Sequence, residues 1–234
     1  MSSGMAWIAQ AVAGKTRVCV YDRAGRGWSE PADTPQDGAQ IATDLHTLLH
    51  RGQVPGPYVL VCHSFGGLYA LSFAARYPDE VAGMVLVDST APAPAGQRRE
   101  APPDEGGTSD LVGRLTALAS ASARLGLGGL VGTPSHVRST LDEYAQASSS
   151  MQDAASLRDF ADKPLIVLTA GTGHDAAWSA DQDALAALST TSVHRVVEGA
   201  SHAGLITDEE GAVATTRAIL DVVTSVRTAR PLAG

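Results

Sequence analysis

Five short runs rich in apolar residues recur along the chain, and helical segments separate most of them. The runs, which suit parallel strands covered on both faces, are 17–21, 58–62, 84–87, 165–168 and 192–197. Segments with apolar residues at helical spacing lie at 40–50, 68–77, 180–188 and 209–227. We therefore predict an α/β fold, with a mostly parallel sheet flanked by helices.

Composition narrows the classes of function. The 234 residues, 44% of them hydrophobic, suffice for one domain with a sizeable core. A net charge of −8 provides no basic surface for nucleic acid, and no apolar run approaches the roughly 20 residues that span a bilayer. Because no secretory signal is visible either, we expect a cytoplasmic protein. The oligomeric state is left open.

One segment interrupts the alternation of strands and helices. Residues 92–107 are rich in proline, glycine and charge, whereas the apolar spacing within 111–125 and 137–144 indicates two helices. This insertion follows the third predicted strand and leaves the sheet at its carboxyl edge. We therefore predict a core of residues 1–90 and 162–234, and a helical lid of residues 91–161 over a site.

The candidate nucleophile is Ser64, which stands between the second predicted strand and a helix. Strand, tight turn and helix are the context of a nucleophile elbow, where small residues two before and two after the serine, here Cys62 and Gly66, avoid a clash. The turn aims the Phe65 N–H and the positive end of the helix at one point, which predicts an oxyanion-hole donor. The alternative is a glycine-rich turn that binds phosphate.

The candidate base is His202, in the loop after the last predicted strand. In open α/β sheets such loops lie at the carboxyl ends of the strands, where sites form, so His202 is placed to take a proton from Ser64. His63 adjoins the nucleophile but points away from it on a tight turn, so we expect it to line or pack the site. His46 and His50 are four residues apart on a helix, but no third metal ligand is evident. We interpret them as an exposed helix face and predict no metal site.

These motifs together resemble the α/β-hydrolase fold superfamily, in its bacterial serine hydrolase and esterase form. The resemblance covers nearly the whole chain and rests on residues 21–29, 61–67, 85–89, 164–171 and 199–202. It implies acyl-enzyme chemistry on a small-molecule ester, thioester or amide, without a cofactor, and a loop with Trp28 beside the substrate. Because the fold also hosts non-enzymes, a non-hydrolytic or catalytically inactive binding module is the alternative.

Proteins of this kind have three strands and an oxyanion loop before the region that corresponds to Trp7, where this chain has six residues. One of those strands would lie between 17–21 and 58–62, and its absence would leave backbone groups unpaired. We expect either a fragment, with residues 1–4 as the tail of the oxyanion loop, or direct pairing of 17–21 with 58–62; the fragment is favoured. The two cysteines lie in these runs, so buried free thiols are expected.

Two acids compete for the role of orienting His202. Asp88 ends the third predicted strand, and Asp175 follows the fourth. The later position is the commoner one across α/β-hydrolases, but some similar proteins carry the Val-Leu-Val-Asp element and no later acid. A carboxylate at the end of an apolar strand also needs a cationic or hydrogen-bonding partner. We favour Asp88, with Asp175 as the alternative.

Overall fold

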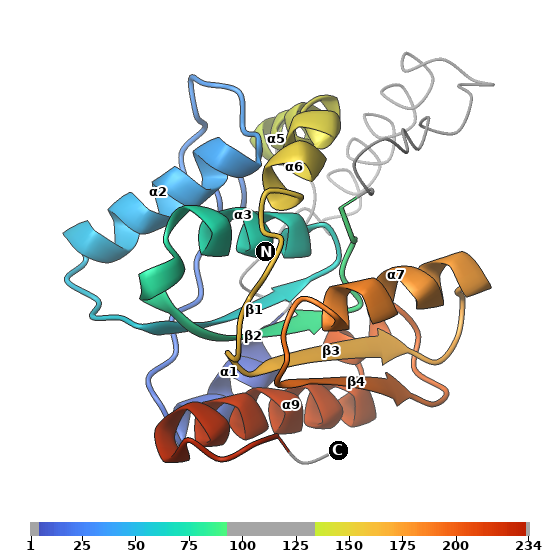
Figure 1. Ribbon diagram of the computed structural model, residues 1–234. Coiled ribbons are helices and arrows are strands. Elements are labelled where there is room, and N and C mark those ends of the chain that lie inside the picture. Colours follow the sequence, from blue (N-terminus) through green and yellow to red (C-terminus); the bar gives the residue numbers. More distant parts are fainter. Residues whose placement is uncertain (1–4, 93–133, 233–234) are drawn as a thin grey trace.

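The structure is a computed structural model that describes residues 5–92 and 134–232. Within these residues one parallel sheet has the strand order β1 (Tyr58–His63), β2 (Val81–Val87), β3 (Leu165–Ala170) and β4 (Ser192–Val197), as Figure 1 shows. Its register aligns the carboxyl ends, because His63 pairs with Val87 and Val87 with Leu168. The predicted α/β fold with a parallel sheet is confirmed.

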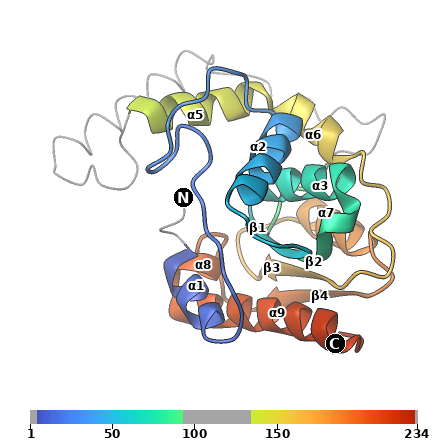
Figure 2. The same cartoon turned by 90° about the vertical axis from the view of Figure 1, so that its left-hand side faces the viewer.

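Helices cover both faces of this sheet, and Figure 2 shows the two layers edge-on. One face carries α2 (Gly38–Arg51), α3 (Gly66–Arg76), α6 (Ala147–Ala154) and α7 (Ala176–Ala186); the other carries α1 (Ala6–Ala13), α8 (Gly204–Thr207) and α9 (Glu209–Thr228). Alternate residues of β2 feed the two cores: Met84 and Leu86 face α3, whereas Val85 and Val87 face α9. The continuous apolar pattern of the strand reflects this double burial.

Local signals fix the helix boundaries. The Asp37 carboxylate accepts the Gln40 N–H at 2.8 Å and so caps α2. Pro78 follows the end of α3 and begins the short 3₁₀ helix η2 (Pro78–Glu80), which leads into β2. None of the helices in the described residues is both long and apolar enough to cross a membrane.

The predicted strand at 17–21 is wrong. This segment joins no strand of the sheet, so direct pairing with 58–62 is also wrong. An extended segment becomes a strand only when a neighbouring strand satisfies its backbone groups, and no strand of the described residues pairs with this largely exposed segment. As a result Cys19 is exposed rather than buried, whereas Cys62 in β1 is half-buried. Residues 1–4, expected to be the tail of an oxyanion loop, lie outside the described residues.

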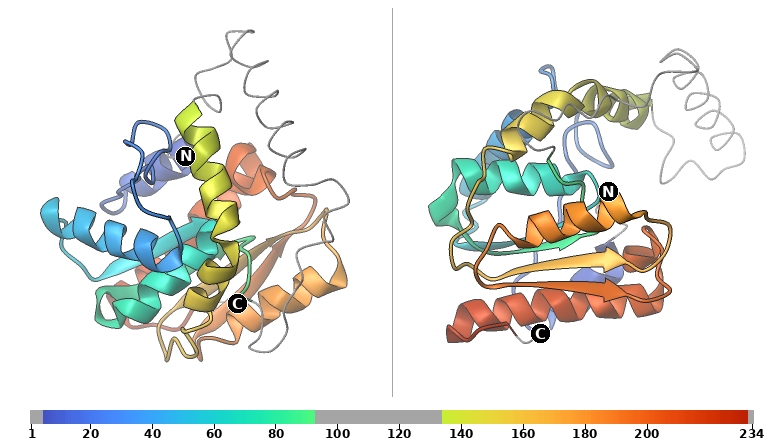
Figure 3. Two further views of the ribbon diagram at one scale, coloured as in Figure 1. Left: turned by 90° about the horizontal axis from the view of Figure 1, so that it is seen from above. Right: turned by 45° about the vertical axis from the view of Figure 1, so that its right-hand side comes forward.

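The described part of the predicted lid contains two helices, α5 (Pro134–Ala145) and α6. The first matches the helix expected around 137–144, whereas the one expected at 111–125 lies outside the described residues. Figure 3 shows α5 and α6 on the outer side of α3, and α6 packs against both α2 and α3. The lid function of this segment remains a prediction.

Ion pairs tie α5 to the loop that precedes α2. Glu143 on α5, 6% exposed, accepts hydrogen bonds from Arg23 at 2.9–3.0 Å and from Arg26 at 2.7–2.9 Å. Each arginine presents a planar fork that matches the carboxylate. Ser139 adds a hydroxyl bond to the Ala24 carbonyl at 3.0 Å. One buried carboxylate therefore positions both the loop and α5.

We expect Glu143→Gln to lower the free energy of unfolding by about 3 kcal/mol, because it leaves two partly buried guanidinium groups without their counter-charge. That value is the low end for breaking a buried pair, since Arg23 and Arg26 keep some contact with water. Urea unfolding of the purified variant measures it. The matched control is Asp221→Asn, which breaks a more exposed pair with Arg195 and should cost less than about 1 kcal/mol. Equal costs for the two variants would contradict this prediction.

Candidate active site

Ser64 stands in the turn between β1 and α3, with a backbone φ of +58°. A non-glycine residue in this left-handed region is strained, and such strain is typical of functional sites. The turn is held from β2: the Ser64 N–H donates to the Val87 carbonyl at 3.1 Å, and the Thr90 N–H donates to the Ser64 carbonyl at 3.1 Å. The serine therefore lies beyond the carboxyl end of β1, braced by the neighbouring strand.

The sequence suggested that Gly66 is small in order to avoid a clash with Cys62, but the tight contact in this turn involves Gly67 instead. A Cβ atom on Gly66 would lie 3.7 Å from the Cys62 Cβ, which is an ordinary contact. A Cβ atom on Gly67 would lie 2.5 Å from the Cβ of Ser89, which is fully buried. The glycine that lets α3 approach the end of β2 is therefore Gly67, not Gly66.

Phe65 occupies the N-cap position of α3, directly after the candidate nucleophile. Its N–H has no acceptor one turn earlier in the helix, and it lies at the positive end of the helix dipole. The Phe65 ring contacts two tyrosines, Tyr69 on α3 at 5.6 Å and Tyr144 on α5 at 6.2 Å between centroids. The backbone here is placed to donate to an anion, and the side chain extends toward α5.

Asp88 follows β2 directly and is fully buried, with a φ of +43°. Its carboxylate accepts from four donors: His202 Nδ1 at 2.5 Å, His174 Nε2 at 2.7 Å, Trp178 Nε1 at 3.0 Å and the Ala170 N–H at 3.2 Å. Burial alone would raise the pKa of this carboxyl, but these hydrogen bonds outweigh it and lower the pKa to about 2. Asp88 is therefore a stable buried anion, and two histidine side chains and one tryptophan side chain donate hydrogen bonds to it.

His202 is oriented from two sides. The Asp88 carboxylate can only accept, so Nδ1 of His202 carries the proton and Nε2 is the acceptor in the neutral ring. The His63 ring packs 4.4 Å from the His202 ring, and its Nε2–H donates to the His202 carbonyl at 2.8 Å. Burial lowers the pKa of His63, so this ring is a neutral support.

His202 contacts the residue next to Ser64 but makes no hydrogen bond to the Ser64 hydroxyl among the described residues. His63, which contacts His202, is the residue directly before Ser64 in the chain. The Ser64 hydroxyl makes no hydrogen bond to His202 among the described residues. In substrate-free enzymes this bond is often long and tightens when substrate binds, so the arrangement is compatible with a nucleophile and its base.

His174 and Trp178 are partners of Asp88 that the sequence did not reveal. The two rings are stacked, with centroids 4.7 Å apart, so that each presents a ring nitrogen to the carboxylate. His174 stands after β3 and Trp178 at the start of α7. The only signal was the position of His174 after a strand, the same signal that identified His202.

Two predicted site residues are not brought to this cluster. The Asp175 carboxylate caps α7 by accepting the Trp178 N–H at 2.8 Å, and it makes no contact with His202 among the described residues. Trp28 is 98% exposed on its loop, away from Asp88 and His202. The geometry thus joins Asp88 to His202 and gives Asp175 a helix-capping contact.

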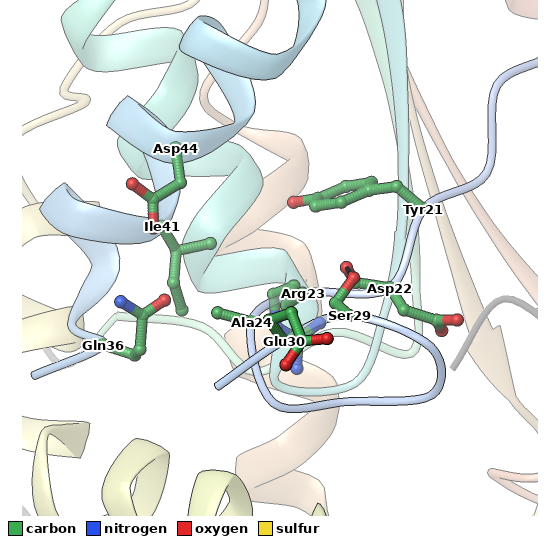
Figure 4. Close-up of a pocket in the computed structure, with 9 residues that line it drawn as sticks. All are labelled: Tyr21, Asp22, Arg23, Ala24, Ser29, Glu30, Gln36, Ile41 and Asp44. Carbon is green, nitrogen blue, oxygen red and sulfur yellow. Dashed lines mark hydrogen bonds between the residues drawn. The ribbon is translucent and has the colours of Figure 1, made fainter. Parts of the chain in front are cut away.

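A pocket of about 250 Å³ lies between the loop at 21–30 and the first turns of α2, as Figure 4 shows. It is lined by Tyr21, Asp22, Arg23, Ala24, Ser29, Glu30, Gln36, Ile41 and Asp44. Arg23 connects it to the turn, because its guanidinium lies over the Tyr69 ring at 4.8 Å and Tyr69 packs against Phe65. Arg23, Tyr69 and Phe65 therefore stand between this pocket and Ser64, and Ser64 does not line it.

The architecture and the cluster at the strand ends define a hydrolase-type α/β fold. The alpha/beta hydrolase family matches residues 2–216. The chain belongs to this family, which confirms the resemblance inferred from its motifs.

Similar proteins place this result in context. An uncharacterized protein of Schizosaccharomyces pombe is 47% identical over 74 residues, 32% of this chain and 14% of that protein, so the match spans about a seventh of the relative. The enol-lactonase of Burkholderia xenovorans LB400 is 22% identical with a TM-score of 0.66, covering 95% of this chain and 86% of that one. A thermophilic esterase of Thermogutta terrifontis is 22% identical with a TM-score of 0.63, covering 97% and 86%. At these identities the likeness to the two structures shows a shared fold alone.

The two glycines after Phe65 give a matched pair of variants. Gly67→Ala should lower the free energy of unfolding by about 1–3 kcal/mol, because the new methyl group overlaps buried Ser89. Gly66→Ala should be neutral or stabilising by up to about 1 kcal/mol, because alanine favours the helix and the space is open. Chemical unfolding of both variants measures the difference. If Gly66→Ala proved the more damaging, the contact described here would be wrong.

Proposed function

We propose that the chain is a serine hydrolase that cleaves a carboxylic ester, thioester or amide through Ser64, His202 and Asp88. The observation that carries the proposal is the hydrogen bond from His202 Nδ1 to buried Asp88, next to a serine held at positive φ. A nucleophile, a base and an acid that orients the base are the parts a catalytic triad needs. They follow the carboxyl ends of β1, β2 and β4, which lie at the same end of one parallel sheet.

The reaction follows from these roles. Nε2 of His202 takes the hydroxyl proton of Ser64 as Oγ attacks the substrate carbonyl carbon. The Phe65 N–H stabilises the oxyanion that forms, and the imidazolium is stabilised by the Asp88 carboxylate. His202 then gives its proton to the leaving alcohol, thiol or amine as the carbonyl re-forms, which leaves an acyl group on Ser64. Water, deprotonated by the same nitrogen, releases the acid and restores the serine.

His202 suits the role of base better than His174. Both rings bond to the same carboxylate oxygen, but through different nitrogens. His202 uses Nδ1, which leaves the outer nitrogen Nε2 free to face a substrate. His174 has committed Nε2 to Asp88, and it is held against Trp178. We assign His174 and Trp178 the support of the carboxylate, and His63 the support of His202.

The substrate side of the proposal rests on the helices above the turn. Tyr144 on α5 is 64% exposed and lies by Phe65, so it is placed to contact an apolar acyl group. The proposed lid of residues 91–161 includes α5. An esterase and an enol-lactonase are among the proteins that share the fold, so the fold accommodates the ester-type substrates proposed here. A small molecule is the proposed substrate.

A fluorophosphonate probe tests the nucleophile directly, because it forms a covalent adduct only with an activated serine. We expect one adduct by intact mass, located by peptide mapping on the tryptic peptide with Ser64, and none in Ser64→Ala. Labelling at a different serine would refute the assignment. A folded wild-type chain that takes up no probe would favour the alternative, a non-hydrolytic or inactive binding module.

The kcat of single variants on a chromogenic ester distinguishes the proposed catalytic residues from those that only support them. Asp88→Asn should lower kcat by about 10⁴, as for the loss of an orienting acid, and His202→Ala should lower it by several orders of magnitude. His174→Ala removes one of four hydrogen bonds to the carboxylate and should cost at most about a hundredfold. The control is Asp175→Asn, which keeps a good capping residue and should change kcat little. The acid is misassigned if Asp175→Asn, correctly folded by circular dichroism, is the inactive one.

A further inference from the structure

A second cluster of histidine and carboxylate side chains lies at the amino-terminal end of the strands, opposite the end that carries the candidate active site. His46 and His50 stand on the last turns of α2, and Glu80 ends η2 just before β2 begins. Figure 1 shows the end of α2 on the side of the sheet away from the arrowheads of the strands. The full length of β2 separates Glu80 from Asp88, roughly 26 Å at the rise of a strand. The cluster is therefore independent of the candidate active site.

The interpretation of His46 and His50 as an exposed helix face is incomplete. The two residues are one helical turn apart on α2, so their rings lie side by side, with centroids 4.2 Å apart. Both Nε2 atoms face the same oxygen, Glu80 Oε1, at 3.0 Å from His46 and 3.3 Å from His50. Glu80 is the third group that the sequence did not show, because it lies 34 and 30 residues further along the chain.

The spacing of these atoms matches that of ligands around one metal ion. Zinc–nitrogen and zinc–oxygen bonds are about 2.0–2.2 Å, which puts neighbouring ligands of a tetrahedral site roughly 3.3–3.5 Å apart. One ligand atom from each of the three residues lies within 4.8 Å of the other two. Two imidazoles and one carboxylate are also a ligand set that Zn²⁺ takes in proteins, with water in the remaining position.

An unsatisfied atom points to the same conclusion. Glu80 Oε2 is buried and makes no hydrogen bond within the described residues. A buried carboxylate oxygen without a partner is costly, and a cation bound by both oxygens would satisfy it. His46 is fixed by stacking on Tyr77, with centroids 4.0 Å apart and planes at 12°. His50 is 59% exposed, which leaves the cluster accessible from water.

We propose that His46, His50 and Glu80 form a binding site for a divalent transition-metal ion of the Zn²⁺ class. The bound ion joins α2 to the connection between α3 and β2, so it stabilises the helical layer from the side remote from Ser64. Imidazole ligands select Zn²⁺, Co²⁺ or Ni²⁺ over Mg²⁺ and Ca²⁺. The proposal does not depend on hydrolase activity.

The test is a titration of the untagged, chelator-treated full chain with ZnCl₂ by isothermal titration calorimetry. We expect one equivalent to bind, with no comparable heat from MgCl₂, and the melting temperature to rise by about 5 °C at saturation. Co²⁺ in place of Zn²⁺ should give the visible absorption of a four- or five-coordinate ion. Absence of Zn²⁺ binding would overturn the proposal and leave a plain hydrogen-bonded cluster.

Variants locate the site. His50→Ala alters a largely exposed ring, and Glu80→Gln keeps the shape of the carboxylate, so each should fold and bind Zn²⁺ at least tenfold more weakly. The control is His194→Ala, whose ring bonds to Asp183 and Thr169 and belongs to neither cluster, so this variant should bind Zn²⁺ as the wild type does. Asp88, His174 and His202 are the other described group with ligand-like spacing. If His174→Ala abolishes binding while Glu80→Gln does not, the ion belongs there and the proposal is wrong.

Discussion

The buried carboxylate of Asp88 is the interaction on which the site depends. A charge taken out of water is tolerated only when donors surround it, and Asp88 has four, drawn from β3, the loop after β3, α7 and the loop after β4. Satisfying one anion therefore fixes the positions of His174, Trp178 and His202 together. The loops of an open sheet edge would otherwise be free to differ, and this shared acceptor gives them one arrangement.

The parallel sheet explains why these groups meet. All strands of a parallel sheet point the same way, so the residue after each strand lies at one edge, and the register of β1 on β2 places Ser64 beside Asp88. Strand and helix patterns are local, and the sequence predicts the four strands and four of their covering helices, α2, α3, α7 and α9, but not α1, α6 or α8. The positions of Ser64 and His202 at the carboxyl ends of β1 and β4 also follow from the sequence, because each stands after a predicted strand; their catalytic roles remain a proposal. The choice of Asp88 over Asp175 was only narrowly favoured, because it depends on which carboxylate the folded loops enclose.

What the sequence missed is non-local in each case. Residues 17–21 have strand composition, but a strand needs a neighbour, and composition does not supply one. The contact between Trp178 and Asp88 spans 90 residues, so no local pattern indicates it. Glu80 reaches His46 across 34 residues, and no spacing motif links them. The tight contact at Gly67 likewise depends on Ser89, which follows the end of β2.

The two strained residues hold each other in place. Ser64 and Asp88 both have positive φ, which costs about 1–3 kcal/mol for each non-glycine residue. Their turns are joined by the bonds from the Ser64 N–H to Val87 and from the Thr90 N–H to Ser64, while the Asp88 N–H donates to Leu168. Neither turn can relax to ordinary backbone angles without breaking hydrogen bonds of its neighbour. The strained turn at Ser64 is therefore held by the same strand end that carries Asp88, so Ser64 and Asp88 are positioned as one unit.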